Sequence, residues 1–91
     1  AGHVELDLSA TPIDLLATSG HKGLLGPLGT GVLVLAARVV DDLPPARFGG
    51  TGTQSELDVQ PTSSPEKYES GNHNVPGLVG LAAALEWGRI N

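Results

Sequence analysis

The chain is organised around the stretch Ser19-Gly20-His21-Lys22-Gly23-Leu24-Leu25-Gly26-Pro27-Leu28-Gly29-Thr30-Gly31, which places one amine among glycines and small polar residues. Glycine and proline at this density exclude regular structure and allow the backbone to approach a ligand or another strand closely. Apolar runs of strand length flank the stretch, Asp14–Thr18 before it and Gly31–Val40 after it. We therefore predict two strands joined by a loop that presents Lys22. The second strand would be buried on both faces, and a helix over Gly31–Val40 is the alternative.

The composition predicts a thin hydrophobic core. The 91 residues include one Phe, one Tyr, one Trp and no Met, whereas thirteen are Gly and seven are Pro. A chain of about this size buries only roughly 60% of its unfolded surface, and large side chains usually dominate the energetics of a core. We therefore expect a chain that is marginal alone or is a piece of a larger protein, and the absence of an initiator Met agrees with a fragment.

Charge and cysteine content exclude several classes of function. The formal net charge is −5, with the acidic residues dispersed, so the sequence does not favour a nucleic-acid surface. The absence of Cys excludes disulfides, thiolate metal ligands and a thiol nucleophile within these residues. Apolar runs fall short of the ~20 residues that span a bilayer, and Ala1–Glu5 does not resemble a signal peptide. We expect no nucleic-acid or membrane partner and a cytoplasmic location.

The second half of the chain divides into an irregular segment and a helix. Residues 41 to 74 lack periodicity and contain consecutive prolines, which predicts a long excursion of functional or interfacial use, with disorder as the alternative. The apolar spacing from about 75 to 89 predicts a helix with Asn74 as its N-cap and Pro76 in its first turn. Its small residues would let it lie close to another element, with Glu86 and Arg89 on the solvent side.

Lys22 and its neighbours suggest a site for a phosphorylated aldehyde. A lysine nucleophile must lose its proton near neutral pH, and a neighbouring cation such as His21 could favour that loss. Ser19, His21 and backbone N–H groups of a glycine-rich loop supply the donors that a phosphate monoester needs. An amine for aldehyde chemistry beside a phosphate cradle indicates pyridoxal phosphate. The alternative from the motif alone is an ordinary solvated lysine in a glycine loop.

Two quoted segments carry a resemblance to a known family. The run from Asp14 through Lys22, followed by Gly26-Pro27-Leu28-Gly29-Thr30-Gly31-Val32-Leu33, resembles the lysine-attachment signature of class V aminotransferases, which depend on pyridoxal phosphate. Within them it is most similar to the cysteine desulfurase and selenocysteine lyase-like branch. Gly49–Gly52 looks like a glycine-rich segment of that branch, with a plain flexible linker as the alternative. Tyr68–Gly77 looks like its Phe-Glu-Ser-Gly-Thr-Pro-Asn stretch.

The resemblance implies a fold and a set of roles. It implies an α/β chain that is a fragment of the fold type I pyridoxal phosphate-dependent transferase large domain, built as strand, lysine loop, strand, irregular excursion and helix over residues 1–91. It also implies that Lys22 forms the internal aldimine and later moves the Cα proton of a small amino-acid substrate, while Ser19 and His21 hold the cofactor phosphate. The full-length parent would be a homodimer in which a Thr reaches the neighbouring subunit's phosphate. Asn72 stands at that position here, and its amide could still donate a hydrogen bond.

Other family features are expected outside these residues. Ala1-Gly2 resembles the end of a family segment whose Asp pairs with the pyridine nitrogen, so that Asp would precede residue 1. Because a pyridinium without its carboxylate is a poor electron sink, we expect the isolated chain to have no appreciable turnover. The departure at Asn72 and His73 leaves open a non-catalytic or degenerate module used for association. His3 and His73 lack a third ligand at useful spacing, so we expect no metal site.

Overall fold

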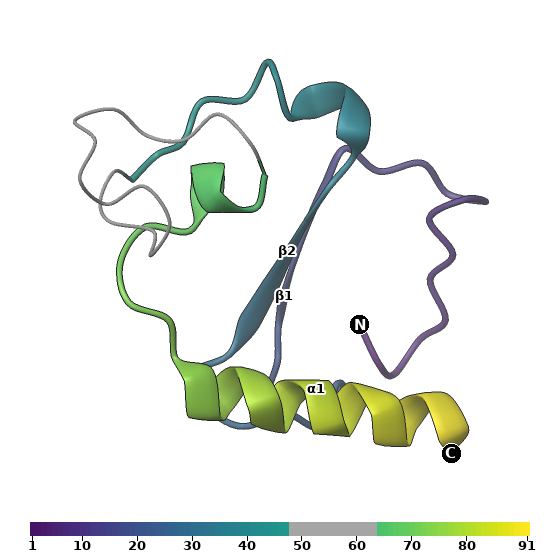
Figure 1. Cartoon of the computed structure of the whole chain (residues 1–91). Helices are drawn as coiled ribbons and strands as arrows, with labels where there is room; N and C mark the ends of the chain where they lie inside the picture. The colour runs from purple at the N-terminus through teal and green to yellow at the C-terminus, as the bar shows by residue number, and fades with distance from the viewer. Residues whose placement is uncertain (48–63) are drawn as a thin grey trace. The chain divides into compact units, whose positions relative to one another are not determined.

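The computed structural model describes residues 1–47 and 64–91. They form the strands β1 (Leu15–Ser19) and β2 (Gly31–Leu35), the short 3-10 turns η1 (Ala37–Val39) and η2 (Glu66–Tyr68), and the helix α1 (Val75–Ile90) (Figure 1). The chain divides into two compact units. One contains Ala1–Ala36 and Asn74–Asn91, and the other contains Ala37–His73.

The strands pair as an antiparallel hairpin around the lysine stretch. Leu15 lies opposite Leu35 and Ser19 lies opposite Gly31, and the N–H of Ala36 extends the ladder by donating to the Asp14 carbonyl at 2.9 Å. The predicted first strand is therefore present, displaced by one residue, since Asp14 lies outside it and Ser19 is its last residue. This register holds the two ends of the Gly20–Thr30 loop side by side, because the last residue pair of the ladder, Ser19 with Gly31, flanks the loop directly.

The second strand is shorter and less buried than predicted. β2 ends at Leu35, and the chain turns at η1, where the N–H of Leu43 donates to the Val39 carbonyl at 2.9 Å. The expectation of a strand running to Val40 with both faces buried is wrong, because Leu33 keeps 52% of its surface exposed. The apolar residues continue past Leu35 on both sides of Arg38, so their pattern does not locate the turn.

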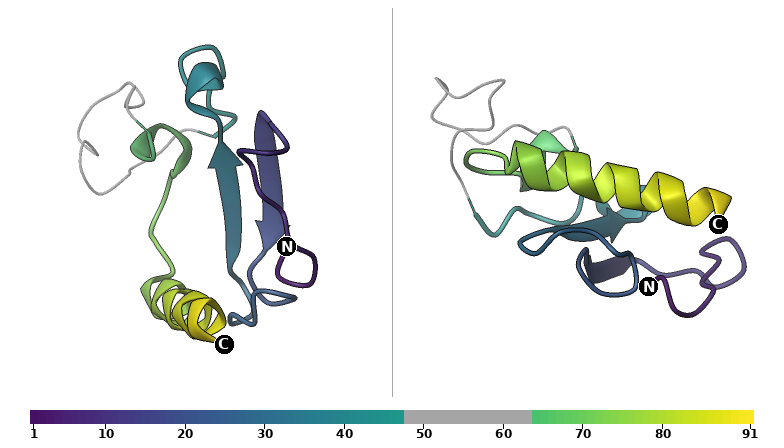
Figure 2. Two further views of the ribbon diagram at one scale, coloured as in Figure 1. Left: turned by 90° about the vertical axis from the view of Figure 1, so that its right-hand side faces the viewer. Right: turned by 90° about the horizontal axis from the view of Figure 1, so that it is seen from below.

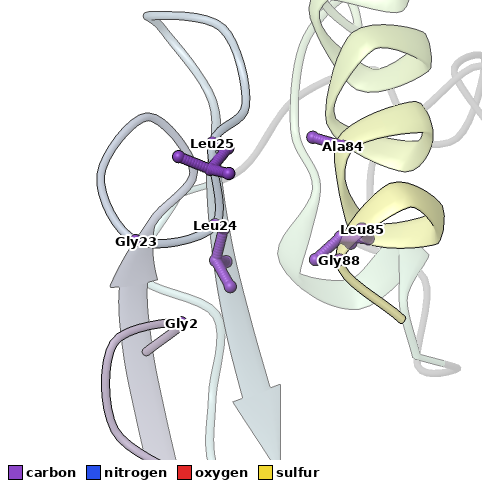
Figure 3. A pocket seen from close by; sticks show the side chains of 7 residues that line it. All are labelled: Gly2, Gly23, Leu24, Leu25, Ala84, Leu85 and Gly88. Atoms are coloured by element: carbon purple, nitrogen blue, oxygen red, sulfur yellow. The ribbon is translucent and has the colours of Figure 1, made fainter. Parts of the chain in front are cut away.

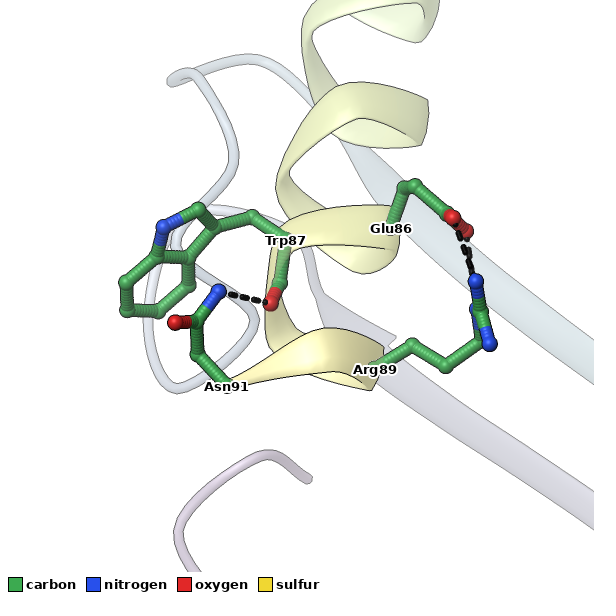
Figure 4. Close-up of polar contacts among 4 residues, drawn as sticks. All are labelled: Glu86, Trp87, Arg89 and Asn91. Atoms are coloured by element: carbon green, nitrogen blue, oxygen red, sulfur yellow. Dashed lines mark hydrogen bonds and ion pairs between the residues drawn. The ribbon is translucent and has the colours of Figure 1, made fainter.

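Helix α1 has the N-cap that its sequence predicts. The Asn74 side-chain oxygen accepts from the Gly77 N–H at 3.2 Å, and the helix runs one residue beyond the predicted end. At the C-terminal end the backbone N–H and the side-chain amide of Asn91 both donate to the Trp87 carbonyl at 2.9 Å (Figure 4). Arg89 pairs with Glu86 through two hydrogen bonds of 2.6 and 3.0 Å on the exposed face, as predicted.

The Gly20–Thr30 loop packs on α1, which crosses the end of the hairpin (Figures 1 and 2). A Cβ built on Gly26 would lie 2.7 Å from Cδ1 of Leu81, and one built on Gly80 would lie 2.6 Å from Cγ of Pro27. These distances are shorter than van der Waals contact, so the loop and the helix approach at separations that only glycine permits. The predicted close approach of the helix through its small residues is confirmed at Gly77 and Gly80.

The hydrophobic core is as thin as the composition predicts. Among residues 1–47 and 64–91, Leu81 is the one apolar side chain that is buried, at 5% exposure. Large side chains of α1 remain exposed, including Val79 at 65% and Trp87 at 57%. The helices of the described ranges are too short or too polar to cross a membrane. Apolar burial in the described part of the first unit is therefore concentrated at Leu81.

In the described part of the second unit, Tyr68 joins two separate segments. The Tyr68 hydroxyl lies 2.9 Å from the Val40 carbonyl and 2.7 Å from the Leu43 carbonyl, and the Lys67 ammonium also donates to Val40. These bonds attach η2 to the residues that follow η1. The described parts of the predicted excursion are irregular apart from this one turn, as expected. Gly49–Gly52 lies outside the described residues.

Replacement of the N-cap tests the start of α1. We expect Asn74→Ala to lower the free energy of unfolding by about 1 kcal/mol, because the Gly77 N–H loses its acceptor. Asn74→Asp keeps an acceptor oxygen and should retain the parental stability. Urea unfolding measures both, and an alanine variant as stable as the aspartate variant would contradict this role of the cap.

A methyl group at Gly26 tests the packing of the loop on the helix. We expect Gly26→Ala to cost about 1–3 kcal/mol, because its Cβ would overlap both Leu81 and the Gly20 carbonyl. Gly88→Ala is the matched control, since nothing lies within 4 Å of a Cβ there, and it should gain up to about 1 kcal/mol of helix propensity. Equal stability of the two variants in urea unfolding would show that the loop does not rest on Leu81.

Candidate functional site

Lys22 lies in a small closed ring of backbone. The N–H of Gly26 donates to the Gly20 carbonyl at 2.7 Å and closes the ring, and the N–H of Leu25 donates to the Lys22 carbonyl at 2.9 Å and forms a tight turn inside it. The backbone of Leu25 has a φ of 61°, a left-handed conformation that residues other than Gly, Asn and Asp rarely adopt. The chain thus reverses direction immediately after Lys22, and Lys22 itself is exposed.

Thr30 joins the ring to the start of β2. Its carbonyl accepts from the Gly20 N–H at 2.8 Å, and its hydroxyl donates to the Pro27 carbonyl at 2.6 Å. Thr30 is only 8% exposed and is the one buried polar side chain among the described residues. A hydroxyl so buried has its hydrogen bond satisfied within the loop, which avoids the cost of an unpaired polar group.

The N-terminal residues pack against the same ring. A Cβ on Gly2 would overlap the backbone of Gly23, and one on Gly23 would overlap the Ala1 carbonyl and lie 2.8 Å from Cδ2 of His3. Gly2 also has a φ of 92°, a conformation suited to glycine. The residue that follows Lys22 is therefore in direct backbone contact with Ala1–His3, and the chain's first residues lie beside the candidate site.

The sequence-predicted site residues fall into two groups. Ser19 is half-buried at the end of β1, and His21 and Lys22 are exposed in the ring that follows it. A hydroxyl, an imidazole and an amine are thus gathered within four residues at one end of the hairpin. This donor set can bind an anion through Ser19 and His21 while the amine of Lys22 meets a carbonyl group.

Asn72 belongs to the other unit, and its predicted contact with a phosphate stays a prediction. It is exposed, as is His73 beside it. The His73 ring Nε2 lies 3.7 Å from a Glu69 carboxylate oxygen, with 39% and 50% of the two side chains exposed. At this distance and exposure the pair contributes little to stability. Over residues 1–47 and 64–91 no three metal-binding side chains gather at one place.

An apolar cavity of about 200 Å³ lies next to the ring (Figure 3). Figure 3 shows the side chains of Leu24 and Leu25 from the ring facing Ala84 and Leu85 of α1. Glycines complete the lining, and it contains no charged or polar side chain. The side chains that line this cavity can accept an apolar group, and the only polar groups in the lining are those of the backbone.

Sequence reasoning missed the residues that hold the ring in place. Thr30 drew no prediction of its own, although a lone Thr in a glycine-rich loop is a candidate for a side-chain bond to a nearby carbonyl. Leu81 is one of several apolar residues on α1, and nothing in the spacing marks it as the buried one. The contact of Gly2 with Gly23 joins residues far apart in sequence, for which a single sequence carries no signal.

Comparison with known proteins places these residues in a family. The family model described as aminotransferase class-V matches residues 1–90. A probable cysteine desulfurase of Pyrococcus abyssi is 39% identical over 89 residues, which cover 94% of this chain and 22% of the relative. The cysteine desulfurase CsdA of Escherichia coli is 42% identical over 89 residues, covering 96% and 22%. The chain therefore spans about 22% of the length of the curated relatives it matches.

A solved structure agrees with the sequence comparison. The cysteine desulfurase of Thermococcus onnurineus superposes with a TM-score of 0.80 at 34% identity, over 98% of this chain and 23% of that one. The predicted fold class, a small α/β part of such an enzyme, is confirmed by this similarity, and the family that the lysine stretch resembles is confirmed as well. The chain belongs to the class-V aminotransferase family, and the relatives it matches are named cysteine desulfurases.

Proposed function

We propose that this chain is the lysine-bearing segment of a pyridoxal phosphate-dependent, cysteine desulfurase-like enzyme that acts on a small amino acid. The observation that carries the proposal is Lys22, exposed in a closed backbone ring inside a family match over residues 1–90. The names of the relatives support desulfuration over amino-group transfer. Because the chain spans about 22% of their length, we assign the activity to the full-length enzyme and none to the isolated segment.

The residues beside Lys22 fit this cofactor by their chemistry. When bound, pyridoxal phosphate supplies an aldehyde, a phosphate and an electron-withdrawing ring. Lys22 would hold the aldehyde carbon covalently through Nζ and, once released from it, would carry the substrate's Cα proton. Ser19 would donate its hydroxyl and His21 a ring N–H to the phosphate oxygens, as the end of a strand followed by a glycine loop allows.

The ring supports this assignment by restricting the backbone of Lys22. A side chain reacts faster when its backbone is already positioned, because less entropy is lost as the reacting atoms meet. The bonds from Gly26 to Gly20 and from Leu25 to Lys22 restrict the backbone on both sides of Lys22. Exposure of Lys22 leaves its amine accessible from outside this segment.

Asn72 and the assembly complete the proposal. We assign Asn72 to the phosphate of the neighbouring subunit in a homodimer, with its amide as the donor. We also assign the full-length enzyme to the cytoplasm, with no nucleic-acid or membrane partner, and the net charge of −5 in this segment does not favour a nucleic-acid surface. His73, paired loosely with Glu69, has no assigned role in cofactor binding.

Covalent trapping on the full-length enzyme tests the role of Lys22. Borohydride reduction makes the bond between Lys22 Nζ and the cofactor's aldehyde carbon permanent, so peptide mass spectrometry should find the cofactor mass on Lys22. We expect Lys22→Ala to abolish this adduct and the visible absorbance of the bound cofactor, with loss of turnover by several orders of magnitude.

Lys67→Arg is the matched control, because Lys67 is the chain's other lysine and the variant keeps its charge. It should leave the Lys22 adduct in place. Cofactor bound to the full-length enzyme through a different lysine would contradict the proposal. An enzyme that binds no cofactor would instead favour a degenerate module kept for association.

A further inference from the structure

One buried residue holds both ends of the segment that carries Lys22. The Thr30 carbonyl accepts from the N–H of Gly20, where the ring begins, and the Thr30 hydroxyl donates to the carbonyl of Pro27, just after the ring ends. The two bonds are 2.8 and 2.6 Å long. Any movement of the ring away from β2 would have to break at least one of them.

Thr30 also connects the ring to α1. A Cβ on Gly77 would lie 3.0 Å from the Thr30 methyl carbon Cγ2, and one on Gly20 would overlap the Thr30 hydroxyl. Thr30 is therefore enclosed between the strand end that precedes His21 and the first turn of the helix. Its hydroxyl contacts the loop and its methyl faces the helix, so the two groups on its Cβ have separable roles.

We infer that Thr30 is a positioning residue for Lys22, acting through the hydrogen bond from its hydroxyl to the Pro27 carbonyl. This bond fixes the exit of the Gly20–Gly26 ring, while the bond to Gly20 fixes its entry. Together these two hydrogen bonds set the direction in which the Lys22 side chain projects from the ring. The inference deepens the proposed function and rests on it, since it assumes that Lys22 binds the cofactor.

Valine and serine separate the two groups of Thr30. Thr30→Val replaces the hydroxyl with a methyl of similar size, so it removes the bond to Pro27 and keeps the contact with Gly77. Thr30→Ser keeps the hydroxyl and loses the methyl. The measurement is the rate at which the cofactor-free full-length enzyme forms its covalent adduct with added pyridoxal phosphate, followed by absorbance and assigned to Lys22 by borohydride trapping and mass spectrometry.

We expect Thr30→Val to slow this rate roughly fivefold, the factor that follows from losing one ordinary hydrogen bond. Thr30→Ser should stay close to the parental rate. Thr11→Val makes the same chemical change at an exposed turn and should have no effect. If Thr30→Val does not fold, Thr30→Ser and Thr30→Ala form a second pair that differ only by the hydroxyl, and the alanine variant should be the slower one.

Three results would overturn the inference. A folded Thr30→Val enzyme with the parental rate would show that the hydroxyl is not needed. Slow adduct formation in Thr30→Ser with the parental rate in Thr30→Val would assign the role to the methyl packed on Gly77, and slow formation in both variants would show that the role is not specific to the hydroxyl. If the parental enzyme, without any substitution, forms no adduct at Lys22, the proposed function is overturned, and the inference that rests on it is overturned as well.

Discussion

The closure of the lysine loop onto the end of its own hairpin is the constraint on which the rest of the first unit depends. The bond from Gly20 to Thr30 continues the ladder that ends at Ser19 and Gly31, and the bond from Gly26 to Gly20 then closes the ring. Short strands of this kind are marginal alone, and a two-stranded hairpin needs a further packed element. Helix α1 supplies it by burying Leu81 against the ring.

Glycine is what permits so small a contact to hold the unit together. With one buried apolar side chain among the described residues, hydrophobic burial is limited, and backbone hydrogen bonds with close helix–loop contacts account for much of the local order. The same closeness restricts the motion of Lys22. Structure and chemistry therefore share residues here, because the ring that packs on α1 also presents the amine.

Local patterns predicted the elements well where one interaction decides them. The Asn74 cap and the helix after it follow from short-range rules, and so does the exclusion of regular structure from the glycine-rich loop. The predicted end of β2 was wrong because apolar residues continue past Leu35 into η1, with Arg38 as the one charged residue among them. Thr30 and Leu81 could not be singled out, since their burial depends on contacts between residues distant in sequence. Ser19, His21 and Lys22 could be named from the motif, and their roles remain predictions together with that of Asn72.

The central claim is that Lys22 is presented by a ring whose shape exists before any ligand binds. Amide hydrogen exchange on the cofactor-free full-length enzyme tests it most directly, because the N–H groups of Gly20 and Gly26 are the donors that anchor and close the ring. We predict that both amides exchange as slowly as those paired between β1 and β2. Exchange of either amide at the rate of an unstructured peptide would contradict the claim.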